Sequence, residues 1–353
     1  MTEAALTHAE FAEAFRHQAR GCALTGSPIY AELLSRAADD LARGGLFADL
    51  VSTYRGTPLL DALPLRILGA VHAMVLGGRA PALAAFYPSA GGRYEADGAY
   101  RALCDLCDAH RDELRDAAAS LRVQTNEVRR SAALLPGFLR VAARTGLPLR
   151  IREIGSSAGL NLVFDRYRYE LGPHRWGDAA SPLTLATAWD GAAPDLAAPL
   201  RVASRRGCDV APFDVRDPAH RLLLESFVWP EQLERLERLR AALALALREP
   251  PEIDAEPAGA WIESQLDAPS DGVATVVFHS VVWWYIPQAE RDRITRAMER
   301  AGASATPAAP LAWLRMEGSK VEEAELRLRL WPAGEEELLA QVHWHGAEVR
   351  WRG

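Results

Sequence analysis

Hydrophobic positions recur at helical spacing through the first 147 residues of the chain. Phe11, Phe15 and Ala19 repeat every fourth residue, and Ser27-Pro28 is typical of an N-cap followed by the first helical turn. Further helical segments are expected around 64–76, 97–119 and 125–143. This pattern predicts an N-terminal part built from helices alone.

From residue 149 onward the pattern changes to alternating strand and helix segments. Val273–Phe278 is a short, continuous apolar run of the kind that a strand buried on both faces requires. A helix is expected over 287–301 and another strand over Leu311–Met316. The alternation predicts a mainly parallel sheet covered by helices.

The chain ends with two segments of period two. Leu326, Leu328 and Leu330 alternate with arginines, Pro332-Ala333-Gly334 can turn, and Leu338–Trp344 can return antiparallel. A parallel core that closes with an antiparallel hairpin resembles the class I methyltransferase sheet, whose final strand inserts antiparallel to its neighbours. We therefore expect an α/β fold: a three-layer Rossmann-like class I methyltransferase sheet over 148–353, preceded by an all-helical N-terminal cap over 1–147.

The segment Leu149–Asn161 reads as a strand, a small-residue loop and the start of a helix. Arg150 and Arg152 alternate with apolar residues, which suits a central strand if their stems lie under the helical part with their heads in water. The small-residue turn Gly155–Gly159 lets a ligand approach the backbone, and the N–H groups at a helix start can receive anionic or hydroxyl groups.

Two chemistries use such a turn. It is either a cofactor loop or a Gly-x-Ser-x-Gly nucleophile elbow with Ser157 as the nucleophile. The elbow needs a histidine and an acid, and His279, Asp254 and Asp271 follow in the chain. A hydrolase of that fold normally builds several strands before its elbow, whereas the preceding 150 residues look helical.

The cofactor reading rests on a resemblance to the first motif of class I methyltransferases. Glu153 fills its acidic place, Gly155 and Gly159 fill its first and last glycine places, and Ser157 replaces the middle glycine. The resemblance implies that this loop, with Ser156 and Asn161, holds S-adenosylmethionine.

Asp209 lies in Arg206–Asp214, which looks like the second-strand motif of the same superfamily. There the resemblance implies an acid that accepts hydrogen bonds from the ribose hydroxyls; an ordinary turn aspartate before Pro212 is the alternative. Asp209 follows Gly159 at more than the ~20 residues of the simplest nucleotide folds. The assignment therefore requires 165–205 to be an insertion or an extra strand pair.

Polar and aromatic residues follow the strongest strand, at the edge where open α/β sheets place ligands. His279 could remove a proton from an acceptor, although a histidine at a strand end is also often structural. Trp283 could contact adenine or face the sulfonium cation, with Ser280 beside it, and Tyr285 could contact the substrate. At least one of these aromatic residues is expected in the core.

A second polar run, Gln124–Glu127, precedes the last helix before the first strand. It is either a helix cap or a polar wall closing a site. In the site reading Glu127 acts as a base or holds a cationic acceptor, and Arg130, Gln124 and Asn126 bind the substrate.

Together these pieces resemble the bacterial domain-of-unknown-function family 2332. The segments that carry the resemblance are Gly26–Tyr30, Tyr87–Gly92, Gln124–Glu127, Glu153–Asn161, Arg206–Asp209 and Phe278–Trp283. They span nearly the whole chain, which implies that the helical and α/β parts belong to one family unit.

Composition narrows the function classes. The net charge of −7 argues against a general nucleic-acid binder, and no run approaches the ~20 apolar residues of a membrane span. The start has no signal-like pattern, so we expect a cytoplasmic protein without a membrane partner. Cys104, Cys107 and His110 suit a buried helix better than a metal site, and no metal is expected.

The leading hypothesis is a methyltransferase that uses S-adenosylmethionine on a small molecule. A non-catalytic protein binding this cofactor or another nucleotide is the alternative, and a serine hydrolase is a weaker one.

Overall fold

The computed structural model describes residues 6–318 and 323–353. It divides into two compact units, Met1–Thr125 with Pro218–Glu237, and Asn126–Asp217 with Arg238–Gly353. This division differs from the expected boundary at residue 147. The helix Arg130–Thr145 joins the second unit because it packs on the sheet, and Pro218–Ser226 joins the first because it packs on Leu63–Leu76.

The described elements of the first unit are all helices. They are α1 (His8–Leu24), α2 (Pro28–Ala42), α3 (Leu46–Val51), α4 (Leu63–Leu76), α5 (Pro81–Ala84), η1 (Pro88–Ala90), α6 (Ala96–Ala109), α7 (Arg111–Ser120) and α9 (Pro218–Ser226). Ser27 caps α2 by accepting a hydrogen bond from the Tyr30 N–H, as its sequence predicts. The single helix expected over 97–119 is wrong, because His110 adopts a non-helical conformation and separates α6 from α7.

The second unit is built on one sheet, whose described part has 11 strands in the order β3-β2-β4-β11-β10-β9-β8-β7-β1-β5-β6. Their bounds are β1 (Leu149–Ile154), β2 (Arg168–Leu171), β3 (His174–Trp176), β4 (Thr184–Asp190), β5 (Val202–Asp209), β6 (Ile253–Ala255), β7 (Ala274–Ser280), β8 (Leu311–Gly318), β9 (Glu323–Trp331), β10 (Glu336–His343) and β11 (Glu348–Trp351). Strands β6, β5, β1, β7 and β8 pair in parallel.

The strongest strand predictions are confirmed. The apolar run around Val276 forms β7 in the parallel region, between β1 and β8. The terminal hairpin is β9 and β10, which pair antiparallel with Leu328 opposite Glu337. The stretch 165–205 supplies the extra strands β2, β3 and β4, which join the sheet where β4 pairs with β11.

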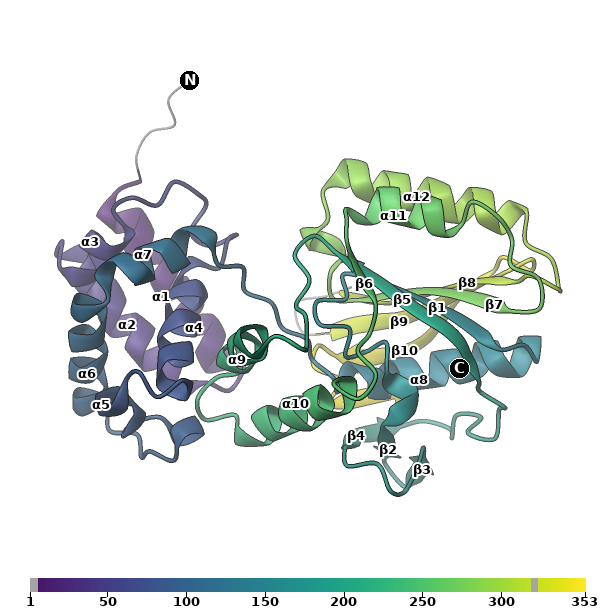
Figure 1. Ribbon diagram of the computed structural model, residues 1–353, viewed down its shortest axis with the longest axis horizontal. Coiled ribbons are helices and arrows are strands. Elements are labelled where there is room, and N and C mark those ends of the chain that lie inside the picture. Colours follow the sequence, from purple (N-terminus) through teal and green to yellow (C-terminus); the bar gives the residue numbers. More distant parts are fainter. Residues whose placement is uncertain (1–5, 319–322) are drawn as a thin grey trace. The chain divides into compact units, whose positions relative to one another are not determined.

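Helices cover both faces of the parallel strands (Figure 1). On one face lies α8 (Arg130–Thr145), whose Phe138 packs edge-on against Phe278 of β7. On the other lie α11 (Ala258–Gln265) and α12 (Gln288–Ala303), which share an apolar cluster with Val277 and Trp313. The central strands are therefore buried on both sides. Helix α10 (Leu233–Ala246) crosses the boundary between the units in sequence.

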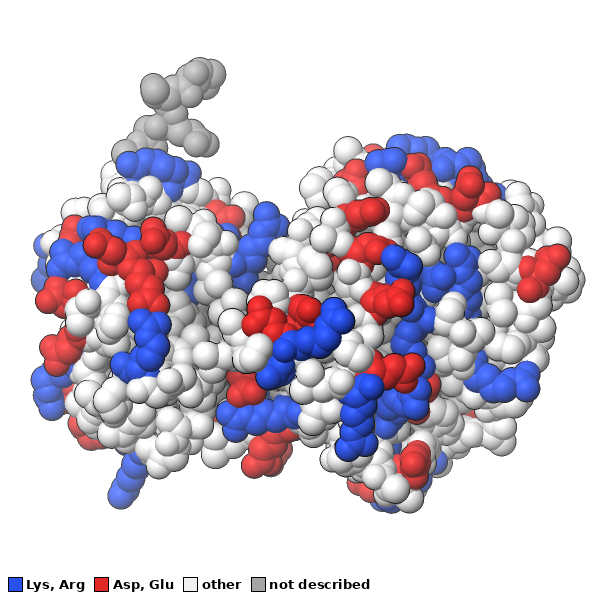
Figure 2. Space-filling model, viewed as in Figure 1, with Lys and Arg blue, Asp and Glu red and all other residues white. Residues whose placement is uncertain are grey.

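The described residues include no helix long and apolar enough to cross a membrane. Acidic and basic side chains are interspersed on the face drawn in Figure 2, in keeping with a charge balance close to even.

Candidate functional site

The candidate residues at the carboxyl ends of β1 and β7 divide between the two faces of the sheet. Glu153 stands beside Phe278 in the β1–β7 register, and Phe278 packs on α8, so Glu153 faces α8. The next residue, Ile154, belongs to the apolar cluster under α11 and α12, and His279 faces that side as well. Two groups result: a carboxylate cluster around Glu153 and a histidine cluster around His279.

The glycine turn between these faces is closely backed by protein atoms. Gly155 and Gly159 have φ values of +70° and +71°, which favour glycine. A Cβ at Gly155 would lie 2.5 Å from Val282 Cγ2, and one at Gly159 would lie 2.7 Å from Pro251 Cγ. Both glycines are therefore required by the packing of the chain itself.

The backbone donors of the turn are also engaged within the chain. The Gly155 and Ser156 N–H groups donate to the Cys208 carbonyl at 2.9 and 3.0 Å. The Ser157 N–H donates to Asp209 Oδ2 at 2.9 Å, and the Leu160 N–H donates to Asn126 Oδ1 at 3.0 Å. The turn is thus held by β5 and by the segment before α8.

The helix expected after this turn is absent, and that prediction was wrong. Residues 155–163 form turns, followed by the short 3-10 helix η2 (Phe164–Arg166) and then β2. The chain enters the inserted strands at this point instead of returning along the sheet as a helix. A helix N-terminus for anions is therefore missing here, as is the strand–turn–helix context of a nucleophile elbow at Ser157.

Asp209 lies at the carboxyl end of β5, beside the turn. Its two carboxylate oxygens each accept a backbone N–H, from Ser157 and from Ala211, both at 2.9 Å. A carboxylate oxygen has a second lone pair, so Asp209 keeps the capacity to accept further hydrogen bonds.

Glu153 is the most unusual group of the carboxylate cluster. Its side chain is buried, with 2% of the residue exposed, and Oε2 has no hydrogen-bond partner in the part of the chain that the structure describes. Burial raises the pKa of this carboxyl well above its ordinary value, and the charge of Asp209 adds to the rise. The Ser156 hydroxyl and the charge of Arg130 act in the opposite direction on the pKa.

Most polar groups around Glu153 have partners. Arg130 donates to the Trp344 carbonyl at 3.0 Å and to the Ser280 carbonyl at 3.2 Å. Ser131 donates to Asn161 Oδ1 at 2.7 Å, and both side chains are buried.

Two further residues predicted on this side, Ser156 and Glu127, have structural contacts. Ser156 is buried and donates to the Glu153 carbonyl. Glu127 is buried and accepts the Arg129 N–H at 3.2 Å. Gln124 falls in the first unit.

The histidine cluster is organised by a carboxylate that the sequence had not indicated. His279 is fully buried and its Nδ1 lies 2.6 Å from Glu317 Oε1. Glu317 also accepts the backbone N–H groups of Val282 and Trp283 at 3.1 and 3.2 Å. Because a carboxylate accepts, Nδ1 of the neutral ring carries the proton, which leaves Nε2 as an acceptor. Among the described residues, Nε2 has no hydrogen-bond partner.

Aromatic rings enclose this histidine. Trp283 stacks on it with centroids 4.9 Å apart and planes at 13°, and Trp313 lies at 6.1 Å. Trp283 is partly buried and packs against the apolar cluster, whereas none of the three aromatic residues Trp283–Tyr285 is fully buried in the core, as was expected for at least one. Tyr285 is 72% exposed, whereas His279 is fully buried.

Glu317 could have been suspected from one signal. It directly follows the predicted strand Leu311–Met316, so it ends a strand next to that of His279. Between them, Val281 has a φ of +53°, which is strained for a β-branched residue, and its N–H donates to the Met316 carbonyl at 2.8 Å. Glu317 therefore fixes both the histidine and the turn that carries Trp283.

The described residues contain no group of three or more His, Cys, Asp or Glu placed to hold a metal ion. Cys104 and Cys107 lie in α6, where Cys107 is buried.

Comparison with known proteins identifies one family. The family model for "Uncharacterized protein conserved in bacteria (DUF2332)" matches residues 12–351, which includes both units. No curated protein and no solved structure matches the chain.

Proposed function

The chain belongs to the bacterial family DUF2332, and we propose that it binds S-adenosylmethionine and transfers the methyl group to a small molecule. In this proposal the second unit is a Rossmann-like, class I methyltransferase-like core and the helical first unit is its cap.

The strand order supports the proposal. Taken in chain order, the five parallel strands stand 3-2-1-4-5 across the sheet, as β6-β5-β1-β7-β8. Open sheets of this kind bind ligands outside the carboxyl ends of their strands, where the order reverses. Here the reversal lies between β1 and β7, which places it at Glu153 and Phe278.

The antiparallel ending agrees with the proposal in part. β9 runs antiparallel to both of its neighbours, β8 and β10. In class I methyltransferases the inserted antiparallel strand is the last one, whereas here β10 and β11 follow β9 and lead on to the inserted strands. This departure lies on the far side of β8 from the candidate site.

The observation that carries the proposal is the orphaned carboxylate oxygen of Glu153. A buried carboxylate without a counter-ion is costly, and a ligand that brings an ammonium group or hydrogen-bond donors would relieve that cost. S-adenosylmethionine carries an α-ammonium group, two ribose hydroxyls and a sulfonium that supplies the methyl group when it is bound. The Glu153 carboxylate could accept hydrogen bonds from the α-ammonium group, and the remaining lone pairs of Asp209 could accept hydrogen bonds from the ribose hydroxyls.

The glycine turn has a smaller part in this binding than the sequence implied, because its N–H groups are held by Cys208 and Asp209. Its role is to carry the chain sharply from β1 past the ends of β5 and β7. The proposed binding groups are thus side chains at strand ends.

Calorimetric titration of the full chain with S-adenosylhomocysteine tests this function, with NAD as the competing ligand class. We expect saturable binding of S-adenosylhomocysteine, weakened at least tenfold in Glu153→Gln, since tenfold corresponds to about 1.4 kcal/mol. Glu337→Gln is the matched control, because Glu337 already has Arg140 and Arg144 as partners. Binding of NAD alone, or labelling of Ser157 by a serine-reactive phosphonate, would overturn the proposal.

A second candidate is a protein that binds the cofactor without catalysing transfer. The burial of both proposed proton acceptors favours it, because His279 is fully buried and Glu127 is 3% exposed. Incubation with S-adenosylmethionine and a library of small hydroxyl and amine compounds separates the two candidates. Release of S-adenosylhomocysteine identifies an enzyme, and binding without release identifies a sensor or scaffold.

A further inference from the structure

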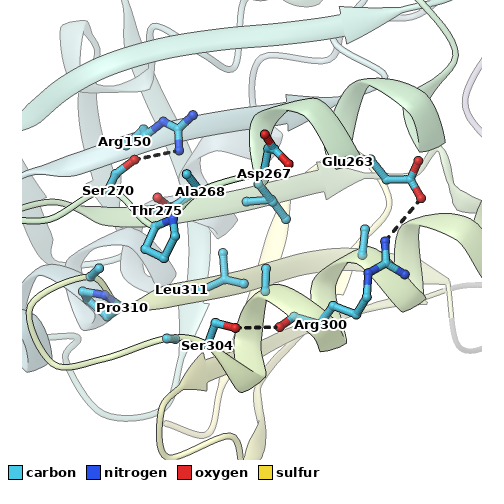
Figure 3. A pocket seen from close by; sticks show the side chains of 16 residues that line it. Arg150, Glu263, Asp267, Ala268, Ser270, Thr275, Arg300, Ser304, Pro310 and Leu311 are labelled. Atoms are coloured by element: carbon cyan, nitrogen blue, oxygen red, sulfur yellow. Dashed lines mark hydrogen bonds and ion pairs between the residues drawn. The ribbon is translucent and has the colours of Figure 1, made fainter.

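A pocket of about 310 Å³ lies in the second unit, under the last turns of α11 and α12. Its floor is a row of neighbouring residues at the starts of three parallel strands: Arg150 of β1, Thr275 of β7 and Leu311 of β8. Parallel strands begin at one edge of a sheet and end at the other, so this pocket lies at the edge opposite Glu153. Figure 3 shows the residues that line it.

Arg150 is the distinctive group of this pocket. Its guanidinium donates to the Ser270 hydroxyl at 3.1 Å and to the Gln265 carbonyl at 2.9 Å, both neutral acceptors. Within the described residues it forms no ion pair with a carboxylate. The other arginine of the pocket, Arg300, pairs with Glu263 at 3.3 Å, a carboxylate that also pairs with Arg293 at 2.6 Å. Arg300 thus has a carboxylate partner, whereas Arg150 has none among the described residues.

A second unpaired arginine lies on the same face of β1. Arg152 is buried and donates to the Gln265 side chain at 2.8 Å and to the Ile151 carbonyl. Both arginines therefore reach α11, which corrects the expectation that their heads lie in water under the helical part. Burial lowers the pKa of Arg150, and burial together with the charge of Arg150 lowers that of Arg152 to about 10. Uncompensated positive charge near a pocket favours an anionic ligand.

The rest of the lining sets the character of that ligand. Leu266, Ala301, Ala305 and Leu311 give the pocket an apolar wall, and its volume is at the lower end of small-molecule sites. Asp267 also lines the pocket, and its carboxylate disfavours a bound anion about twice as strongly for two negative charges as for one. A small ligand with one negative charge and an apolar body matches these features.

We propose that this pocket binds a small monocarboxylate, with its carboxylate on Arg150 and its apolar body against Leu266, Leu311 and Ala301. The site is separate from the one proposed for S-adenosylmethionine and does not depend on it. Binding would tie α11 and α12 to the starts of β1, β7 and β8.

Ligand-observed NMR titration of the full chain tests the site with three probes: hexanoate, hexylammonium and inorganic phosphate. We expect hexanoate to bind saturably at roughly millimolar concentration, as its size allows, and the other two probes to bind at least tenfold more weakly. Arg150→Met should weaken hexanoate binding at least tenfold. Arg300→Met, the control, should change it less than twofold because that guanidinium is already paired.

Arg150 also contacts the end of α11, so its substitution could disturb the fold. Ala301→Leu provides the second variant, since it fills the pocket without touching the guanidinium contacts and should abolish hexanoate binding. Equal binding of hexylammonium, preferential binding of phosphate, unchanged affinity in Arg150→Met or Ala301→Leu, or no saturable hexanoate binding would each overturn the proposal.

Discussion

Glu153 and His279 stand at the ends of neighbouring strands, on opposite faces of the sheet, and both are buried. Within residues 6–318 and 323–353, each has one side-chain atom without a hydrogen-bond partner, Oε2 of the glutamate and Nε2 of the histidine. They differ in the partners that the chain provides for the rest of each side chain. His279 has the carboxylate of Glu317 and the stacked ring of Trp283, whereas Glu153 forms no ion pair within the described residues.

This difference means that the protein fixes the His279 side chain but leaves the Glu153 carboxylate able to bind a ligand. A histidine fixed by a carboxylate and enclosed by aromatic rings has a defined tautomer and little freedom to move. A buried carboxylate without a cation raises the free energy of the folded state until a ligand or a proton neutralises it. We therefore propose Glu153 as the ligand-binding group, and His279 and Glu317 as the framework of the turn beside it.

The largest expected effect on stability comes from removing the carboxylate of Glu317, which holds His279. Glu317→Ala leaves the buried Nδ1–H of His279 and two backbone N–H groups without their acceptor. We expect the free energy of unfolding to fall by about 2–4 kcal/mol, measured by urea denaturation. Glu317→Gln should recover part of this loss, because its amide oxygen can still accept.

Glu299→Ala is the matched control for that measurement. Glu299 pairs with Arg329 at an exposed position, and we expect a change below about 0.5 kcal/mol. If Glu317→Ala cost no more than this control, the histidine cluster would not be held in the way described and the contrast with Glu153 would disappear.

Substitution of Glu153 should raise the free energy of unfolding, whereas substitution of Glu317 lowers it. Because the folded-state pKa of Glu153 is raised, the folded protein keeps a proton that the unfolded chain loses as pH rises above about 4.5. The contribution to stability is thus complete below that pH and is lost as pH rises toward the folded pKa. Glu153→Gln, which cannot ionise, should be more stable than the natural chain at pH 8 by on the order of 1–2 kcal/mol.

Thermal denaturation at pH 4.5 and pH 8 checks this sign. The advantage of Glu153→Gln should shrink at pH 4.5, where the natural carboxyl is largely protonated in the folded state. A variant less stable than the natural chain at pH 8 would show that the carboxylate has a stabilising partner after all, and would remove the basis for a ligand at this position.

Much of the fold could be predicted from the sequence. The continuous apolar run of β7 and the alternating leucines of β9 are local patterns that follow from burial on two faces and on one face. The helix expected after Gly159 failed because nothing local distinguishes an amphipathic helix start from the turns that lead into inserted strands. That outcome depends on where β2 and β4 pair, which is a long-range property.

The sequence predicts which strand ends carry the candidate residues, but not which face of the sheet each side chain occupies. Strand ends at the order reversal could be expected to approach one another, and Glu153 and His279 do occupy adjacent strand ends. Their separation onto two faces depends on register, since a shift of one residue would have exchanged the faces. The pairing of Glu317 with His279 likewise follows from the β7–β8 register, which the sequence does not state.

The smallest expected effect on stability concerns a third carboxylate, in the short strand β6, whose partners are supplied by the chain. Asp254 of β6 accepts two hydrogen bonds from Arg206, at 2.7 and 2.8 Å, and one from the Trp261 indole. The hydrogen bonds from Arg206 lower the pKa of this carboxyl, so its stabilising effect is present above the unfolded pKa and is lost as pH falls through the folded one. Asp254→Asn should therefore cost stability at pH 7, by about 0.5–1 kcal/mol once solvent screening is allowed for, and cost less at pH 3.

Urea denaturation of this variant beside Glu153→Gln should give changes in the free energy of unfolding whose pH dependences have opposite slopes. Slopes of the same sign would contradict the comparison. They would mean that the presence or absence of an arginine partner does not determine how each carboxylate affects the free energy of unfolding.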